Sequence, residues 1–448
     1  MKTLRPFLAM LMALAIMLPA GANARGLIRD AEIERTIGML SAPVFQSAGL
    51  SPDSITIYLL NDSSLNAFVF GGRNMVFNTG LLIRLKTPES LMAVMAHEAG
   101  HITGGHLTRR AVNAQNLQGA AAVGAVLAIL AGAAAGSSDV AVAGALGAQG
   151  AARRALLAYT RGEESAADQA GATYLEGAGV DPGAMLDVLQ LFRGQEVFQA
   201  GVVDPYALTH PLSSDRMELL RNRSDRSRAR GGKAPAEFNY WHQRMRAKLS
   251  AFLSSPERTL AILEEETNPN NEANTMRRAI AYHLKPEPEK ALAAADALIA
   301  LRPNDPYYWE LKGQILFENG RAEEAIAPYR KAVELAPREP LIRAYLGRAL
   351  LAQNDPALNA EALATLEEAT RTDSGEPAVL RDLALAYARD GQEGKAALAT
   401  AERYALQGEP REAYRHATRA LDQLPLGSPG WLKADDIRAV AERTLRAN

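Results

Sequence analysis

The chain of 448 residues contains no cysteine. Disulfide bonds, iron–sulfur clusters, thiolate metal sites and a cysteine nucleophile are therefore excluded, and any metal must be held by histidines and carboxylates. A strong charge of one sign is also missing, because the formal net charge is −2, so no nucleic acid is expected as a partner. With 48% hydrophobic and 22% charged residues, the composition is that of a globular protein with two or three domains.

Long hydrophobic runs are scarce, and the first lies at the N-terminus. Residues Phe7–Leu18 are uncharged and apolar, and they follow Lys2 and Arg5. The run is short for a membrane span, and small residues follow it at a suitable cleavage position. We therefore predict a signal peptide over residues 1–24, cut after Ala24, in preference to a retained membrane anchor.

The motif His97-Glu98-Ala99-Gly100-His101 carries the chemistry. It lies in an apolar segment that opens with a proline at residue 88 and is predicted to be a helix. Histidines four residues apart share one helix face, so His97 and His101 are positioned to bind one metal ion. Glu98 is placed to reach a water on that metal without binding the metal itself.

A third ligand is expected downstream. Zinc in hydrolases takes three protein ligands and keeps one open position. Glu164 and Asp168 are also four residues apart on one predicted helix face. We predict that Glu164 binds the metal and that Asp168 accepts the second ring N–H of a ligand histidine. Glu163 lies off that face and is the weaker candidate.

These motifs resemble the gluzincin metallopeptidases that include the HtpX and CAAX-prenyl-protease group. The matching segments also include Asn66-Ala67-Phe68, Gly71-Gly72, Asn78-Thr79-Gly80-Leu81, Gly179-Val180-Asp181-Pro182 and Thr209-His210-Pro211. The resemblance implies a zinc endopeptidase with one Zn²⁺ per chain, in which Arg161 joins Asp168 in supporting the ligands. Together with the signal peptide, it implies a periplasmic enzyme involved in quality control of outer-membrane proteins.

Further roles are expected for individual residues. Glu98 is expected to act as the general base, and His210 either closes on the zinc as a fourth ligand or stabilises the oxyanion, unless it is structural. An edge strand formed by Asn74, Met75, Val76 and Phe77 is expected to pair with an extended substrate. A structural or surface position is expected for the other histidines, His106, His242, His283 and His416.

Two further segments lie outside the motifs, one rich in Ala and Gly and one polar. Residues 119–150 are rich in Ala and Gly, and Asp139 is their only charge. We favour a mobile helical lid on glycine hinges, while a membrane-surface or re-entrant hairpin and a true span stay open. Around residues 224–236 the chain becomes polar, which predicts a linker and a solvated helix end carrying the arginines Arg216, Arg221, Arg223, Arg226, Arg228 and Arg230.

An internal repeat follows the linker. Pro306 and Pro340 are 34 residues apart, as are Gly313 and Gly347. A period of about 34 residues with a helix–turn–helix pattern resembles the tetratricopeptide repeat, whose arrays form curved surfaces that bind proteins. The predicted fold is thus an α+β zinc metallopeptidase domain (residues 25–235), mostly helical with a small sheet, followed by an all-α repeat solenoid (residues 236–448).

The predicted function is hydrolysis of peptide bonds in misfolded or stalled envelope proteins, with the repeats binding substrates and possible contact with the outer-membrane assembly machinery. The alternative is a latent protease that acts mainly as a periplasmic chaperone or scaffold. Every catalytic residue is retained in the sequence, which favours the enzyme.

Overall fold

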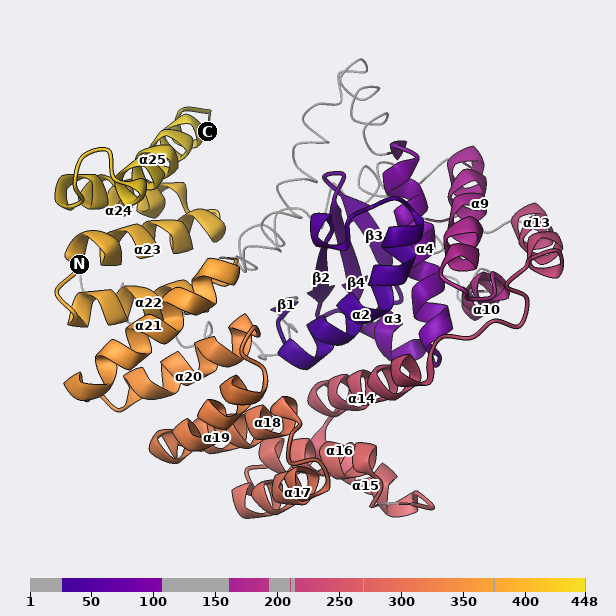
Figure 1. Ribbon diagram of the computed structural model, residues 1–448, viewed down its shortest axis with the longest axis horizontal. Coiled ribbons are helices and arrows are strands. Elements are labelled where there is room, and N and C mark those ends of the chain that lie inside the picture. Colours follow the sequence, from indigo (N-terminus) through magenta and orange to yellow (C-terminus); the bar gives the residue numbers. More distant parts are fainter. Residues whose placement is uncertain are drawn as a thin grey trace, which may run out of the picture.

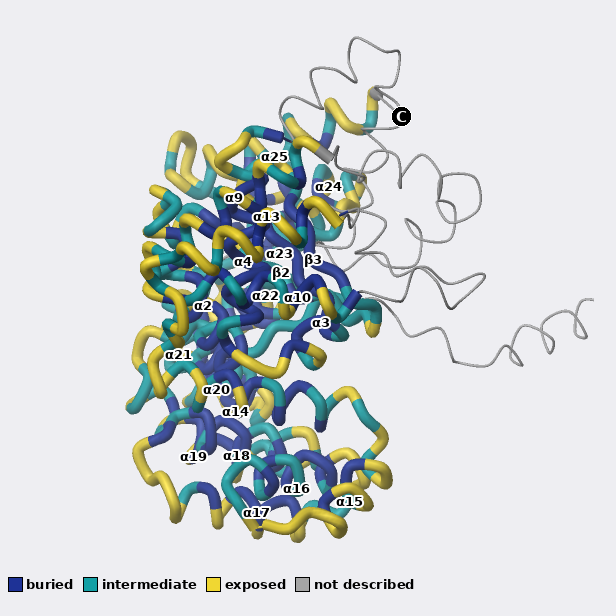
Figure 2. Tube along the Cα trace, turned by 90° about the vertical axis from the view of Figure 1, so that its right-hand side faces the viewer, coloured by how far each residue is buried: buried dark blue, intermediate teal, exposed yellow. Residues whose placement is uncertain are grey.

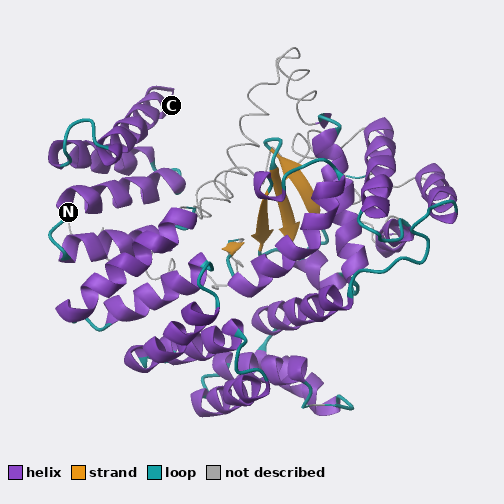
Figure 3. Cartoon of the chain, viewed as in Figure 1, coloured by secondary structure: helices purple, strands orange, loops and turns teal. Residues whose placement is uncertain are grey.

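The computed structural model describes residues 26–106, 161–192, 210, 214–268, 270–373 and 375–447. These residues form a small sheet with helices around it, followed by a long series of helices (Figures 1 and 3). The predicted signal peptide and the predicted lid over 119–150 lie outside the described residues. None of the described helices has the length and apolar character needed to cross a membrane.

The sheet has four strands in the order β1-β2-β4-β3. The strands are β1 (Leu27–Ile28), β2 (Thr56–Leu60), β3 (Ala67–Phe70) and β4 (Asn74–Asn78). β2 and β4 are parallel, with Thr56 opposite Asn74, whereas β1 pairs with β2 and β3 pairs with β4 in antiparallel fashion. The tight turn between β3 and β4 uses Gly71 and Gly72, which both have positive φ.

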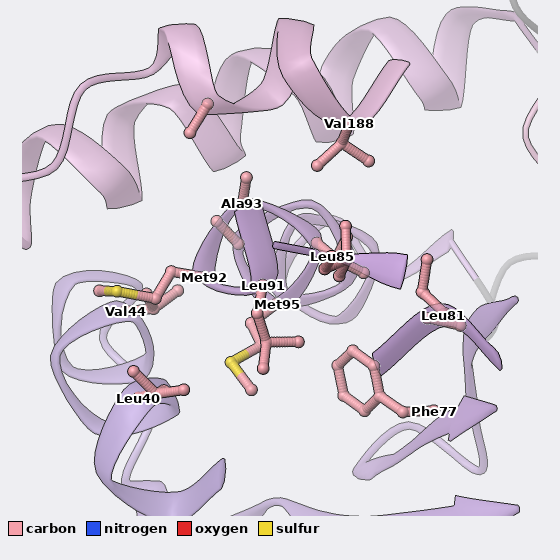
Figure 4. Packing of buried hydrophobic residues seen from close by; sticks show 14 of the residues in the cluster. Leu40, Val44, Phe77, Leu81, Leu85, Leu91, Met92, Ala93, Met95 and Val188 are labelled. Carbon is pink, nitrogen blue, oxygen red and sulfur yellow. The ribbon is translucent and has the colours of Figure 1, made fainter. Parts of the chain in front are cut away.

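One face of the sheet packs on helices. α2 (Ala31–Ser47) contributes Leu40 and Val44 to this core, and α4 (Pro88–Thr103) contributes Met92 and Met95 (Figure 4). The short helices η1 (Pro52–Ser54) and α3 (Thr79–Arg84) flank the strands. α4 begins as the sequence predicts, because Pro88 occupies the first turn and the hydroxyl of Thr87 accepts a hydrogen bond from the backbone N–H of Ser90.

Two glycines let α4 approach α9 (Arg161–Gly177) closely. A Cβ at Gly100 would lie 2.8 Å from the backbone oxygen of Ala167, and one at Gly171 would lie 3.1 Å from the backbone nitrogen of His97. Larger side chains would hold the helices apart. The close approach brings the histidines of α4 beside Glu164 of α9. The helices α10 (Gly183–Phe192) and α13 (Ser214–Asp225) pack behind this pair.

The C-terminal helices form an arc that runs from α14, below the sheet, round to α25 at the upper left in Figure 1. They are α14 (Ala236–Leu253), α15 (Pro256–Glu265), α16 (Glu272–Leu284), α17 (Pro288–Leu301), α18 (Pro306–Glu318), α19 (Ala322–Leu335), α20 (Pro340–Ala352), α21 (Pro356–Thr372), α22 (Pro377–Arg389), α23 (Glu393–Leu406), α24 (Pro410–Gln423) and α25 (Pro429–Ala447). A Cβ at Gly313 would meet Tyr329, and one at Gly347 would meet Leu366. The repeating glycine thus marks where the two helices of a unit cross.

α14 joins the two parts of the molecule. Met245 and Leu249 belong to the core of the sheet domain, whereas Ala247 and Ala251 belong to the core of the repeats. Figure 2 shows buried chain where successive helices meet and exposed chain along the outer turns. The predicted boundary at residue 235 remains a prediction, and the helix that begins there contributes to both cores.

Candidate metal centre

Three segments bring the predicted ligands together. His97 and His101 come from α4, Glu164 comes from the first turn of α9, and His210 comes from a segment just before α13. All four side chains are buried, and each offers a donor atom within 4.8 Å of the others. Residues more than a hundred positions apart therefore converge on one point.

The donor spacing fits a tetrahedral metal ion. Nε2 of His97 lies 3.1 Å from Nε2 of His101, 3.2 Å from Nδ1 of His210 and 3.4 Å from Oε2 of Glu164. Nδ1 of His210 lies 3.1 Å from Oε1 of Glu164. Ligands on a tetrahedral zinc with metal–ligand bonds of about 2.0–2.1 Å are separated by about 3.3–3.4 Å. The residues present therefore fit a single four-coordinate ion.

Glu98 lies beside the donors without belonging to them. Its carboxylate is fully buried, and neither oxygen has a hydrogen-bond partner among the described residues. Burial raises the pKa of Glu98 to about 6, although the neighbouring His210 and His97 act in the opposite direction. Oε1 of Glu98 is 3.5 Å from Nε2 of His210. The group is thus a buried carboxylate that faces His210 and is not held by any hydrogen-bond donor among the described residues.

Asp168 and Arg216 support the ligands. Oδ1 of Asp168 is 2.9 Å from Nδ1 of His97, which fixes the ring with Nε2 toward the donor cluster. Arg216 donates from Nε to Asp168 at 2.6 Å, and its Nη1 is 3.0 Å from Glu164. Despite their burial, both carboxyl groups have lowered pKa values, for Asp168 through Arg216 and His97 and for Glu164 through the neighbouring histidines.

Arg216 corrects the prediction of a solvated helix end. Its side chain is only 3% exposed, and it pairs with Glu164 and Asp168 of α9. The signal in the sequence is its spacing from Leu220, since both residues lie on the buried face of α13. Arg161, predicted for the supporting role, begins α9, and its side chain lies outside the described residues.

His106 is the second supporting residue that the sequence did not reveal. It is buried, and its Nδ1 lies 2.9 Å from Nδ1 of His101. Gly105 has a φ of +61°, and a Cβ at Gly104 would lie 2.5 Å from Nε2 of His106. The two glycines therefore allow the chain to turn back so that His106 reaches the ligand. In the sequence, the pair Gly104-Gly105 before His106 was the signal that could have indicated this contact.

The prediction of an edge strand at Asn74, Met75, Val76 and Phe77 is wrong. These residues lie in β4, which pairs with β2 on one side and β3 on the other, so its backbone groups are already used. The edge position belongs to β3, because the Gly71-Gly72 turn folds that strand back on the outer side of β4. Within the described sheet, Ala67–Phe70 is paired along one side only.

The fold and the site define a metallohydrolase, with two helical histidines, a carboxylate from a second helix and an adjacent glutamate. Residues 28–224 match the family model described as Peptidase family M48, and residues 285–340 match one described as Tetratricopeptide repeat. Residues 28–224 are therefore similar to peptidase family M48 and a later segment is similar to tetratricopeptide repeats, and these matches indicate a metalloprotease.

Curated relatives match most of the chain. It is 27% identical to the "Beta-barrel assembly-enhancing protease" of Yersinia pestis over 404 residues, which cover 90% of this chain and 82% of the relative. The identity is also 27% to the protein of the same name from Escherichia coli K12, over 93% of this chain and 85% of the relative. The sequence resemblance to metallopeptidases with C-terminal repeats is thereby confirmed.

Solved structures of repeat proteins resemble part of the chain. One is described as "MamA RS-1 ArsTM double mutant", with 20% identity, a TM-score of 0.32, and coverage of 37% of this chain and 93% of that one. At this TM-score, the likeness adds nothing to the functional assignment.

Proposed function

We propose that the protein is a zinc-dependent endopeptidase whose ion is held by His97, His101 and Glu164. The observation that carries the proposal is the donor spacing of 3.1–3.4 Å around one point, with Glu98 beside it. Zinc is preferred because the donors are imidazole nitrogens and a carboxylate in tetrahedral spacing. We propose one ion per chain, because the described part of the chain contains one such group of donors.

When bound by His97, His101 and Glu164, a zinc ion would supply Lewis-acid chemistry, that is, polarisation of a peptide carbonyl and a lower pKa of water. Glu98 would accept a proton from the attacking water and return it to the amine that leaves, because its buried carboxylate lies beside the donor cluster without belonging to it. Asp168 holds the ring of His97 in the required orientation, and Arg216 holds Asp168 and Glu164.

Substrate binding is proposed at β3 in place of β4. An extended peptide adds to a sheet edge through backbone hydrogen bonds, which give affinity without strong sequence preference. Ala67–Phe70 offers such an edge, and β3 packs beside α4, which carries the donors. This arrangement suits a protease whose substrates are unfolded chains.

The cellular role is proposed from the relatives' name and the predicted signal peptide. We place the mature chain, starting at Arg25, in the periplasm, where it cleaves misfolded or stalled outer-membrane proteins that the repeats help to bind. The assembly machinery of those proteins is the proposed partner. Mass spectrometry of the protein purified after expression of the full sequence tests the cleavage after Ala24. A protein that keeps Met1 and is found in the membrane fraction would contradict the periplasmic location.

The decisive experiment separates the base from the ligands. Glu98→Gln is expected to retain one equivalent of zinc and to lose peptide cleavage by a factor of about 10²–10⁴. His97→Ala, His101→Ala and Glu164→Ala are expected to lose the metal as well as the activity. Metal analysis and a casein assay on each purified variant measure both. Stoichiometric zinc in Glu164→Ala would remove that residue from the ligand set, and Glu163 would be tested next.

One observation favours a gated form of this enzyme. Nδ1 of His210 lies within the donor cluster, at 3.2 Å from Nε2 of His97. A histidine that stays there takes the place next to Glu98 that a reacting water needs. We therefore propose that the protease is latent in this arrangement and becomes active when His210 moves away, which combines the enzyme with the alternative of a chaperone-like protein.

A further inference from the structure

A basic surface lies on the side of the peptidase domain that is away from the repeats. It consists of the end of α13, which stands at the right-hand edge of the molecule in Figure 1, and of the chain that leads from α13 to α14. Residues 217–235 include six basic and two acidic side chains, although the net charge of the whole chain is −2. The basic side chains are all exposed, and we call them the arginine surface: Arg221, Arg223, Arg226, Arg228, Arg230 and Lys233.

Most of these cations are not neutralised within the protein. Arg223 pairs with Glu176 of α9, and Arg230 lies 3.4 Å from Asp225. The helix dipole favours a cation in the last turn of α13, which accounts for Arg223 but not for cations beyond the helix. The other members of the arginine surface make no ion pair with any described residue: Arg221, Arg226, Arg228 and Lys233.

The chain that carries the arginine surface is held in a fixed conformation. Asp181, in the turn before α10, accepts hydrogen bonds from the hydroxyl of Ser224 at 2.9 Å and from the backbone N–H of Gly231 at 2.6 Å. Gly231 has a φ of +74°, and a Cβ at Gly232 would lie 2.4 Å from the backbone oxygen of Gly179. The exposed cations therefore extend from an anchored backbone, which distinguishes this segment from a flexible linker.

An exposed apolar side chain accompanies the cations. Leu219 is 51% exposed and precedes Arg223 by one turn of α13. Cations attract lipid phosphates, and an apolar side chain beside them enters the boundary between headgroups and acyl chains. Long arginine side chains without fixed partners suit a fluid layer of headgroups better than one ligand of defined shape. We propose that the arginine surface binds a membrane that contains anionic lipids.

This binding places the metal centre next to the membrane. The buried face of α13 carries Arg216, which pairs with Glu164 and Asp168. One helix thus contacts the metal ligands on its buried side and carries part of the arginine surface on its exposed side. Proteins at the membrane then come within reach of the proposed peptidase, whereas the binding itself does not depend on peptidase activity.

Co-sedimentation with lipid vesicles tests the proposal. The chain beginning at Arg25 is used, so that the apolar N-terminal run does not itself bind lipid. Vesicles of phosphatidylglycerol and phosphatidylcholine in equal parts are compared with vesicles of phosphatidylcholine alone. Each cation near an anionic surface strengthens binding about fivefold, so the anionic vesicles are expected to bind at least about 100-fold more tightly.

Two results of this comparison overturn the proposal. One is equal binding to the two kinds of vesicle, including no binding to either. The other is binding to soluble poly-aspartate without binding to anionic vesicles, which would assign the arginine surface to an acidic protein.

Paired substitutions locate the binding. Arg226→Gln combined with Arg228→Gln is expected to weaken binding to anionic vesicles about tenfold or more. The control, Arg338→Gln combined with Arg411→Gln, removes the same charge from two exposed arginines of the repeats. It should change the affinity less than about twofold, because charges farther from the membrane than the Debye length are screened. Equal weakening in the two double variants overturns the proposal.

The double variants are expected to be as stable as the unaltered chain in urea denaturation. None of the four side chains has a hydrogen bond or an ion pair with a described residue. If a variant does not fold, the comparison of the two kinds of vesicle with the unaltered chain still decides the proposal. Metal analysis and casein cleavage test the peptidase separately.

Discussion

At the scale of single residues, the centre combines groups with different freedom to move. His97 and His101 are fixed on a buried helix, and Asp168 and His106 hold their rings from behind. His210 lies outside any helix or strand, just before α13. A ligand on such a segment exchanges more readily than one on a helix, so His210 is the residue suited to a gate.

His210→Ala is therefore expected to raise basal proteolysis while zinc is retained. We expect the rate to rise about tenfold if, in the unaltered protein, His210 occupies the closed position ten times as often as the open one. Casein cleavage and metal analysis on the same preparation measure it, and self-cleavage is expected to accompany it. An inactive variant with bound metal would instead assign His210 to transition-state stabilisation, and an unchanged rate would leave it a structural role.

At the scale of elements, the distance between α4 and α9 determines whether the centre forms. Gly100→Ala places a methyl group 2.8 Å from the backbone oxygen of Ala167, which cannot move without α9. We expect a loss of about 1–3 kcal/mol in the free energy of unfolding and a zinc affinity reduced about 10–100-fold. Chelator competition and urea denaturation measure the two.

Gly162→Ala on α9 is the matched control for this change. A Cβ there meets nothing within 4 Å, so neither zinc affinity nor folding should suffer. Equal behaviour of the two alanine variants would show that the helix spacing is not set by Gly100.

α14 carries a histidine that makes stability depend on pH. His242 is fully buried, and neither ring nitrogen has a hydrogen-bond partner among the described residues. Burial, and secondarily the charge of Arg246, lowers the pKa of His242 to about 4. As the pH falls below about 6.5, His242 becomes protonated in the unfolded chain but stays neutral in the folded chain. The free energy of unfolding therefore decreases until the pH reaches about 4.

The contribution of His242 amounts to up to about 3 kcal/mol over this range. His242→Leu should flatten the fall in the free energy of unfolding between pH 6.5 and 4, with little cost at pH 7, because no hydrogen bond is removed. Urea denaturation at several pH values measures the slope. His416→Gln, at a less buried position, is the control, and an identical slope in His242→Leu and the unaltered chain would contradict the assignment.

At the scale of the whole molecule, buried charges fasten the peptidase domain to the repeats. Lys248 of α14 is fully buried, 2.8 Å from Asp30 at the start of α2 and 3.4 Å from Glu310 of α18. Beside it, Arg244 pairs with Glu32 at 2.7 Å. The pairs link three elements from both parts, so the repeats are held in a fixed position relative to the metal centre.

Lys248→Met should cost about 3–5 kcal/mol of unfolding free energy, because it leaves buried carboxylates without their cation. Adding Glu310→Gln should recover part of the loss. Lys285→Met, which removes an exposed pair with Glu287, should cost far less, because both charges remain hydrated. Urea denaturation measures the stability of all three variants. Equal losses for Lys248→Met and Lys285→Met would contradict a stabilising role of the buried ion pairs between the two parts.

The sequence by itself determined the chemistry that short spacings encode. A histidine pair four residues apart lies on one face of any helix, and Glu164 and Asp168 follow the same rule on α9. The repeat helices were likewise predictable, because each unit packs mainly on its neighbour and repeats its own signals, such as Gly313 and Gly347. These features need only local geometry.

Only the tertiary structure decided which distant groups meet. Arg216 and His106 reach the ligands through a buried helix face and a glycine turn, and neither has a spacing that marks it as a partner of Glu164 or His101. The order of the strands placed β4 inside the sheet, because a parallel strand and a hairpin partner cover both of its sides. Tertiary structure likewise forms the cavity bounded by α2, α14 and the turns before α18 and α20, because its walls come from segments hundreds of residues apart.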